Sequence, residues 1–425
     1  MSNHIKSHHA KRITQMLSSK KPKDIVKFLY SELKNMNFMN KERCNAYLII
    51  YIIVFTIIFS FLYIIKDENK PEDYAFGGDF ILFWAASKQL IHGHIYDIYN
   101  TSAHDAVMQS AHALSHPYKL PFLYPPSMLF FIWPWAFFTY TLSYTLWGLT
   151  APFITAKTLS ILCRNWSITA FAFVSPQFCI SLVTGQTGLL IALILTLGFY
   201  YIEKNPFVSG LFFGLLIIKP HVAFLVPLGL IFMGRWRTII GMMTSATCMV
   251  GLSLCVFGLD AWIRFFEYSH MMQDSILHNV ALCQIFITLF GFLSVHHVPF
   301  STALWLQIIF SSTIIMFVFY KIKKGKNIKN NLILCLTASP LCTPYLLHYD
   351  LTYMMIPAIW MINTAIETKF LPWEKLLLIV LYFSPFYILS LTLHYHMPIE
   401  PIIALIFLYV ASRRHSYLEK NAVQC

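Results

Sequence analysis

The feature that most constrains this chain is an unbroken apolar run from Ala46 to Ile65, AYLIIYIIVFTIIFSFLYII. About 20 such residues in a helix cross the hydrocarbon core of a bilayer. The run begins too far from the N-terminus, and is too long, to be the apolar segment of a signal peptide. It therefore predicts a membrane span that stays in the protein.

The rest of the chain has the composition of a protein that crosses a membrane many times. It is 57% hydrophobic and 12% charged, whereas roughly 25% of residues are charged in an average soluble domain. We predict an all-α polytopic membrane protein with about 12 transmembrane helices, some of them short or broken. After the first span, the apolar runs lie at 126–149, 167–184, 188–202, 206–218, 221–234, 238–258, 301–320, 331–347, 351–365, 374–391 and 400–412.

Charge gives this chain an orientation. Residues 1–45 carry ten Lys and Arg against three acidic residues, whereas residues 66–125 carry four against seven. Basic flanks stay in the cytoplasm, so we predict a multi-pass protein of the cytoplasmic membrane with both termini inside. The net charge of +12 is then an orientation signal and not a nucleic-acid footprint, although contact of the basic tail with anionic lipid stays open.

These boundaries divide the chain into three parts. Residues 1–45 form a basic cytoplasmic tail, 46–412 a single membrane domain, and 413–425 a second cytoplasmic tail. Two long segments fall outside the membrane, the first outer loop at 66–125 and a second at about 259–300. The second mixes apolar and polar residues as a helix lying in the membrane interface does.

Several unusual polar groups fall on the predicted outer side. The run 206–234 is too long for one crossing and short for two, so we interpret it as a hairpin with an outward bend at 219–221. Unpaired polar groups near membrane depth cost several kcal/mol and therefore mark functional sites. The residues that converge are Asp79, Tyr124, Gln186, Lys219, His221, His348, Tyr349 and Asp350.

Each of these groups also has a simpler structural interpretation. Asp79 follows two glycines and precedes an apolar stretch that ends at Gly93, which is typical of a helix N-cap and a terminating glycine. Lys219 can extend its side chain to the interface. His348 can be a packing histidine, and Gln186 can cap a turn.

The remaining clusters favour packing or solvation over a cofactor. Phe80, Phe83 and Trp84 stand at helical spacing and are predicted to pack. None of the nine cysteines forms a Cys-x-x-Cys pair, so we predict no zinc site. The first outer loop holds histidines without ligand spacing, predicted to be solvated, and we expect no metal and no other cofactor. They are His92, His94, His104, His112 and His116.

Five stretches, in order, resemble glycosyltransferase family 87, which holds polyprenyl-phosphate-mannose-dependent α-mannosyltransferases of the C-type membrane superfamily. Together they span roughly residues 75–360, and two departures occur, at Thr187 and Thr343. The stretches are GDFILFWAASKQLIHG with YDIY, LPFLYPPSMLFF, GQTGLLIALILTLGFYY, PFVSGLFFGLLIIKPH and SPLCTPYLLHYDL.

The resemblance implies a C-type fold, an outer-face active site, a lipid-linked donor and a catalytic aspartate in the first outer loop, matching Asp79. One carboxylate is enough for a single inverting displacement when the leaving group is already a phosphate. Lys219, His348 and His221 are the candidates to bind that phosphate. The acceptor is expected to be a glycolipid or glycan.

Other classes remain open from the residues alone. A lipid or sugar flippase or transporter would share many spans and broken helices, and an acyl- or phosphotransferase of envelope lipids is a third reading. A sugar-nucleotide donor is disfavoured, because the sequence contains neither a glycine-rich phosphate loop nor an Asp-x-Asp motif.

Overall fold

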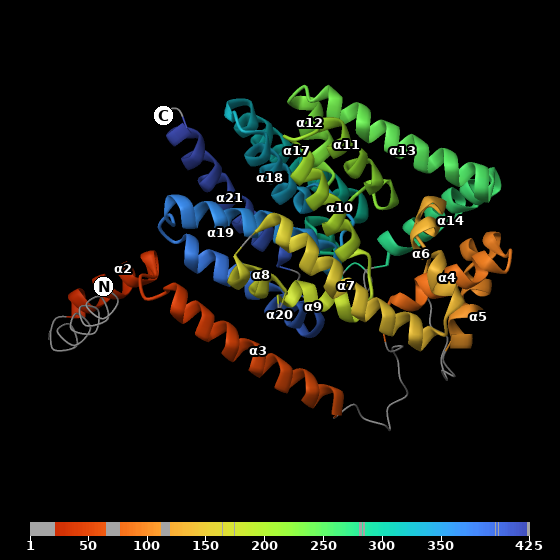
Figure 1. The fold of residues 1–425 in the computed structure, drawn as a ribbon, viewed down its shortest axis with the longest axis horizontal. Helices are drawn as coiled ribbons and strands as arrows, with labels where there is room; N and C mark the ends of the chain where they lie inside the picture. Colours follow the sequence, from red (N-terminus) through yellow and green to blue (C-terminus); the bar gives the residue numbers. More distant parts are fainter. Residues whose placement is uncertain are drawn as a thin grey trace.

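The fold is helical throughout the part that can be described, which confirms the predicted all-α class. In the computed structural model every regular element of that part is an α-helix or a 3-10 helix (Figure 1). The structure describes residues 22–64, 77–111, 120–163, 165–173, 175–279, 283, 285–395, 397 and 399–422. His112, His116 and the start of the basic tail lie outside these ranges.

Two described helices are long and apolar enough to cross a membrane alone. They are α13 (Trp236–Phe257) and α17 (Phe300–Lys324), close to the predicted runs 238–258 and 301–320. A bent pair, α8 (Trp166–Phe173) and α9 (Pro176–Thr184), would make a third if both arms form one span. The chain is therefore a membrane protein, and its described residues contain fewer such helices than the 12 predicted for the whole chain.

Several predicted runs are divided into shorter helices. The run 126–149 is not one span, because it breaks into η2 (Pro126–Met128), α6 (Leu129–Ile132), η3 (Trp133–Phe137) and the start of α7 (Tyr140–Leu162). Proline at the start of η2 and within η3 interrupts the ladder of backbone hydrogen bonds.

The predicted hairpin at 206–234 is also built of short pieces. It contains α11 (Pro206–Gly214), η4 (Leu215–Ile218) and α12 (Leu225–Phe232). A helix rises about 1.5 Å per residue, so none of these pieces spans roughly 30 Å of hydrocarbon. The preceding helix, α10 (Gly188–Tyr201), is likewise short for a span.

The described helices of the first outer segment are part of the core and not an open loop. α4 (Phe80–Ile91) is buried along most of its length, and Phe80, Phe83 and Trp84 pack as predicted. It ends at Gly93, which has the left-handed φ of +77° expected of a terminating glycine. η1 (Ile95–Tyr99) and α5 (Thr101–Ala111) follow.

One predicted solvated histidine lies in this core. His104 is buried on α5, and its Nδ1 lies 2.7 Å from Gln89 Oε1 on α4. The prediction was wrong here because the segment packs its own helices against each other. His92 and His94 are exposed, as expected of a solvated surface.

The second outer segment contains an amphipathic helix, α14 (Leu259–Leu277), and the short α16 (Leu289–Val295). Trp262 and Tyr268 of α14 are buried, while Leu259 and Phe266 are exposed. This division is what a helix lying in a membrane interface requires, although its depth in a membrane stays a prediction.

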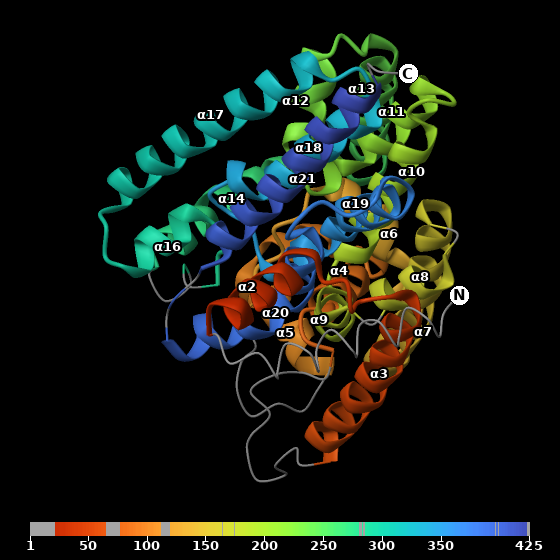
Figure 2. The same ribbon diagram turned by 90° about the vertical axis from the view of Figure 1, so that its left-hand side faces the viewer.

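The C-terminal third supplies the remaining helices. They are α18 (Ile328–Ala338), η5 (Ser339–Cys342), η6 (His348–Met354), α19 (Met355–Thr368), α20 (Glu374–Tyr395) and α21 (Glu400–Ala422). α21 packs beside α18 and α20 (Figure 2). At the other end of the chain, α2 (Pro22–Asn35) precedes α3 (Lys41–Ile64), which holds the first apolar run.

The predicted C-terminal tail begins inside α21, which continues to Ala422. Arg414 is fully buried there, and its Nε donates a hydrogen bond of 2.8 Å to Glu374 Oε1. A second bond joins its terminal guanidinium nitrogen to the same carboxylate. Arg414 therefore holds α20 to α21 as well as adding positive charge at this end.

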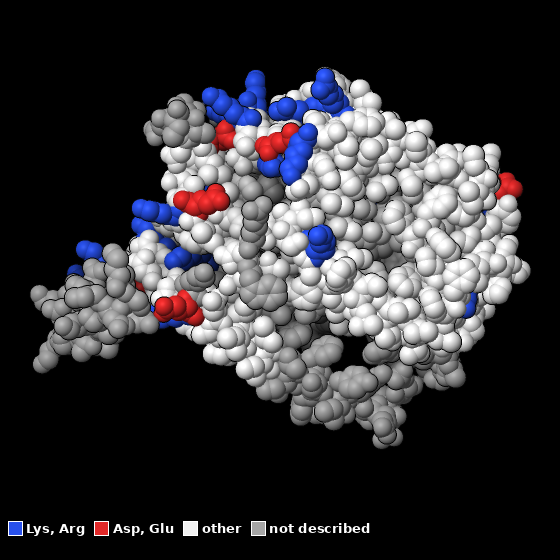
Figure 3. Space-filling view, in the orientation of Figure 1, with Lys and Arg blue, Asp and Glu red and all other residues white. Residues whose placement is uncertain are grey.

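Basic residues from several joints between the apolar runs lie at one end of the molecule. Lys329 Nζ lies 2.6 Å from Glu203, which neighbours Lys204 at the end of α10. The backbone N–H of Lys326 donates to Glu419 on α21 at 2.8 Å. Lys and Arg side chains lie along the upper edge of the view in Figure 3. Three basic segments distant in sequence thus share one end.

The clustering gives a test of orientation. After replacement of the native cysteines, Asn100→Cys on the predicted outer side should react with an impermeant thiol reagent added to spheroplasts. Lys326→Cys should react only after permeabilisation, because both positions are exposed but on opposite sides of the predicted membrane. The reverse pattern would invert the topology.

Candidate active site

Five of the predicted site residues form one continuous chain of hydrogen bonds. Lys219 Nζ donates to Tyr124 Oη at 3.3 Å, and Tyr124 Oη donates to Gln186 Oε1 at 2.9 Å. Gln186 Nε2 donates in turn to Asp79 Oδ2 at 2.7 Å. At the other end, Lys219 Nζ lies 2.5 Å from Asp350 Oδ1. Residues from five distant stretches therefore meet.

Two glycines allow these stretches to approach. Gly185 ends α9 with a left-handed φ of +63°, and a Cβ there would overlap Phe80 Cβ beside Asp79. A Cβ on Gly188 would overlap the carbonyl oxygen of Tyr349. The Gly-Gln-Thr-Gly turn thus contacts the Asp79 turn on one side and η6 on the other. Backbone contact of this kind needs residues without side chains.

Asp79 does not cap its helix as predicted. It occupies the N-cap position of α4, but its side chain makes no capping hydrogen bond. Its backbone is already helical, with φ −72° and ψ −6°, whereas a capping side chain requires an extended N-cap backbone. The carboxylate instead bonds to Gln186, so Gln186 is a partner of Asp79 and not simply a turn cap.

The environment of Asp79 favours the protonated, neutral form of its carboxyl group more than water does. Burial raises the pKa of the Asp79 carboxyl above its usual range, while the Gln186 hydrogen bond and the charge of Lys219 lower it by less. Oδ2 accepts from Gln186, and the described residues provide no hydrogen-bond donor to Oδ1. A carboxylate with a raised pKa and one unoccupied oxygen is suited to accept a proton.

Lys219 and Asp350 form a buried ion pair at the predicted bend. Their side chains are 7% and 1% exposed. Asp350 Oδ2 also accepts from the backbone N–H of Leu347 at 3.2 Å, which fixes the start of η6. Lys219 Nζ lies 4.8 Å from the ring centre of Tyr349 and 5.4 Å from that of Tyr124, so aromatic faces stabilise the charge further.

The two histidines have different surroundings. His221 lies in the same bend as Lys219, half-buried and with its ring against Tyr345, and its Nε2 has no hydrogen-bond partner among the described residues. The bend is strained at Ala223, which has φ +57°. His348 lies outside the hydrogen-bonded chain. Its Nε2 lies 3.2 Å from Glu400 Oε1, at ion-pair distance but outside hydrogen-bond geometry.

α9 secures η6 against the site. Gln177 Nε2 donates to the carbonyl of His348, Ser181 and Thr352 bond through their hydroxyls, and Ser181 also donates to the carbonyl of Tyr349. These contacts hold Tyr349 and Asp350 beside the Gly-Gln-Thr-Gly turn.

A groove of about 720 Å³ lies next to Asp79. Gln186 and Thr187 give it a polar edge, and Phe80, Trp135 and Trp147 give it aromatic walls. Sequence analysis missed both tryptophans, because they fall in the run 126–149, which was predicted as a membrane span and not as part of a site. Asp79 adjoins the groove through its neighbour Phe80 and its partner Gln186 but does not itself line it, and neither do Lys219, Tyr124 and Asp350.

A model of glycosyltransferase family 87 matches residues 122–344, which is about half of the chain. The chain belongs to glycosyltransferase family 87. The matched part contains Tyr124, Gln186, Lys219 and His221, whereas Asp79 and Asp350 join it through the hydrogen bonds described above. No curated protein and no solved structure matches this chain.

Family membership makes this protein a membrane glycosyltransferase. It favours an enzyme over the flippase or transporter that the residues alone left open. The finer points of the sequence analysis, namely the C-type fold, the lipid-linked donor and the role of each residue, stay predictions.

Because Lys219 is paired with Asp350, replacing it should lower the stability of the fold. No such loss is expected for a lysine that only binds a phosphate. Lys219→Met leaves Asp350 buried without a counter-ion and should destabilise the fold by about 3–5 kcal/mol. The double variant Lys219→Met/Asp350→Asn removes both charges, keeps an acceptor for Leu347 N–H, and should recover most of that loss. Thermal unfolding of the purified variants in detergent makes the comparison. A double variant no more stable than the single one would contradict it.

Proposed function

We propose that this glycosyltransferase transfers a hexose, mannose in the first instance, from a polyprenyl-phosphate donor to a hydroxyl group of a glycolipid or glycan. The reaction takes place on the outer face of the cytoplasmic membrane. The observation that carries the proposal is the directed chain from Lys219 through Tyr124 and Gln186 to Asp79. It joins a cation suited to a phosphate with a carboxylate suited to a hydroxyl.

In the proposed reaction Asp79 is the base. Its Oδ1 takes the proton of the acceptor hydroxyl as that oxygen attacks the anomeric carbon of the donor sugar. The bond from this carbon to the phosphate oxygen breaks on the opposite face, and the lipid phosphate leaves with the electron pair. The product has the inverted configuration, and one carboxylate suffices because the phosphate leaves without a general acid.

The donor phosphate has two candidate partners at the bend. An ammonium group has three N–H donors, and Lys219 uses two of them on Tyr124 and Asp350. The third is available to a phosphate oxygen, and the unpartnered Nε2 of His221 offers a neighbouring bond. Asp350 and Tyr349 position Lys219, while Tyr124 and Gln186 orient Asp79. His348 is not part of this phosphate site in the proposal, because a carboxylate already faces it.

The groove beside Asp79 suits the rest of the donor. Its apolar and aromatic walls match an isoprenoid chain, and Trp135 and Trp147 can stack on a sugar ring. Transfer is tested with purified protein in detergent and a radiolabelled polyprenyl-phosphate mannose. A covalent glycosylated product supports the proposal, and absence of transfer with several lipid-phosphate hexoses and acceptors would oppose it.

Asp79→Asn separates chemistry from structure. Asn keeps the volume and an oxygen to accept from Gln186, so the variant should fold and bind donor nearly as well as wild type. Its turnover should fall by roughly 10²–10⁴-fold, the contribution of a positioned base. Asp97→Asn, on an exposed acid of the same segment, is the matched control and should keep wild-type turnover. Near wild-type turnover of Asp79→Asn would exclude the base role.

The pH dependence of transfer tests the Gln186 bond. Gln186 lowers the pKa of Asp79, so Gln186→Leu should raise that pKa and move the acid limb of the kcat/KM profile to higher pH. A hydrogen bond to a charged group is worth about 1.5–3 kcal/mol, which corresponds to a shift of about 1–2 pH units. An unmoved acid limb would mean that the group titrating in this limb is not Asp79.

A further inference from the structure

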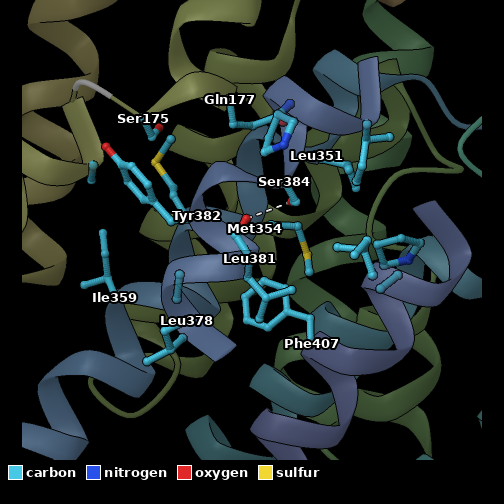
Figure 4. Close-up of a pocket in the computed structure, with 18 of the residues that line it drawn as sticks. Ser175, Gln177, Leu351, Met354, Ile359, Leu378, Leu381, Tyr382, Ser384 and Phe407 are labelled. Atoms are coloured by element: carbon cyan, nitrogen blue, oxygen red, sulfur yellow. Dashed lines mark hydrogen bonds between the residues drawn. The ribbon is translucent and has the colours of Figure 1, made fainter. Parts of the chain in front are cut away.

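A second cavity lies on the other side of η6, between α8, α19, α20 and α21. Its empty volume is about 1170 Å³, and it shares no lining residue with the groove beside Asp79. Figure 4 shows Ser175 and Gln177 at one end and Ile359, Leu378 and Phe407 at the other. The cavity is therefore amphipathic along its length.

The polar end contains two buried groups whose hydrogen-bonding capacity is unused. Glu400 is 4% exposed, and its Oε1 accepts from Thr392 Oγ1 at 3.1 Å. Its Oε2 accepts no hydrogen bond from the described residues, and Nε2 of His348, which lies 3.2 Å from Oε1 at ion-pair distance, makes no hydrogen bond with them. Buried polar groups are almost always satisfied in native proteins. The open carboxylate oxygen and the imidazole are adjacent and belong to residues that line the same cavity, so they indicate a polar group of a ligand that reaches both.

The apolar end has the chemistry of a hydrocarbon site. Its walls are aliphatic and aromatic side chains from four helices, including Ile359, Leu381, Ala404 and Phe407. A ligand that fills the cavity therefore carries a long apolar body and a small polar head. Membrane lipids are the molecules of this form that surround a membrane protein.

We propose that this cavity binds a membrane lipid with an uncharged, hydroxyl-bearing head group. The hydroxyl donates to Glu400 and accepts from His348, which satisfies both open groups. An anionic phosphate head is disfavoured, because it would meet the Glu400 carboxylate where few polar groups screen the repulsion. The site is separate from the donor site and does not depend on the proposed reaction.

η6 connects this cavity to the active site. His348 and Leu351 line the cavity, whereas Asp350 of the same turn bonds to Lys219. In this proposal Glu400, the first residue of the last apolar run at 400–412, binds the head group of the lipid. Sequence analysis did not predict this role. The available signal was a lone carboxylate at the head of that run, the same pattern as Asp79 before α4.

The test uses two photoactivatable lipids with identical diazirine-bearing acyl chains, a diacylglycerol and a phosphatidic acid. Each is added to the purified full-length protein in detergent, cross-linked, and mapped by mass spectrometry. Diacylglycerol should label cavity residues such as Met354, Ile359 and Phe407 at least about tenfold more than phosphatidic acid. Equal labelling by the two lipids would overturn the proposal.

Four variants provide controls for the labelling experiment. Glu400→Gln removes the charge and should raise phosphatidic acid labelling toward that of diacylglycerol. Ala404→Trp fills the cavity and should abolish labelling by both, whereas Ile402→Trp, on an exposed position of the same helix, should leave it unchanged. Leu381→Phe serves as a milder filling variant if Ala404→Trp lowers the Tm. Labelling that persists in a folded filling variant would also overturn the proposal. Because labelling requires no sugar transfer, failure here and failure of the proposed reaction are distinguishable.

Discussion

The buried ion pair between Lys219 and Asp350 is the interaction on which the site depends. Two charges at this depth are costly, and the pair is tolerated only because further bonds satisfy both partners. Tyr124 accepts from Lys219, two aromatic rings face its ammonium group, and the Leu347 amide donates to Asp350. The pair therefore fixes the bend at 219, the start of η6 and the phenol of Tyr124 together. Removing either charge would disturb all three.

From this pair the site continues through a series of hydrogen bonds, each with a fixed donor and a fixed acceptor. Lys219 can only donate, so Tyr124 accepts from it and uses its own hydrogen on Gln186. Gln186 then presents its amide N–H to Asp79. The glycines at 185 and 188 make the arrangement possible, because side chains there would separate the three backbone segments. A cation and a carboxylate are thus joined without neutralising each other directly.

The two cavities lie beside this polar centre and differ in their polar edges. The groove at Asp79 has amide and hydroxyl groups at its edge, while the cavity at His348 has a carboxylate and an imidazole. In the two proposals the former holds the sugar and the isoprenoid chain of the donor, and the latter holds a lipid with an uncharged head group. η6 lines the cavity at His348, and Asp350 of the same turn bonds to Lys219. A ligand in that cavity would therefore contact the turn that positions Lys219.

The sequence by itself determined the class of this protein and most members of its site. A 20-residue apolar run and a low charge content are sufficient for a membrane protein, since few folded chains can bury that surface otherwise. The ordered motifs were sufficient for family 87, which the family match confirms. Gly93 was correctly predicted to terminate α4, because a left-handed terminus is a local property of the backbone.

Tertiary structure decided what local patterns could not. The position of Asp79 predicted a cap, but contact with the Gly185–Gln186 turn gave its carboxylate a different partner. Hydropathy gave an apolar run at 126–149 in which proline allows short or re-entrant pieces, and the structure shows where the run divides, at η2, α6 and η3. His348 and Asp350 are two residues apart and were predicted to lie at one site, but η6 turns one toward Glu400 and the other toward Lys219. Sequence specifies which polar groups are present, whereas their partners depend on which distant backbones can approach, and that depends on packing of the whole chain.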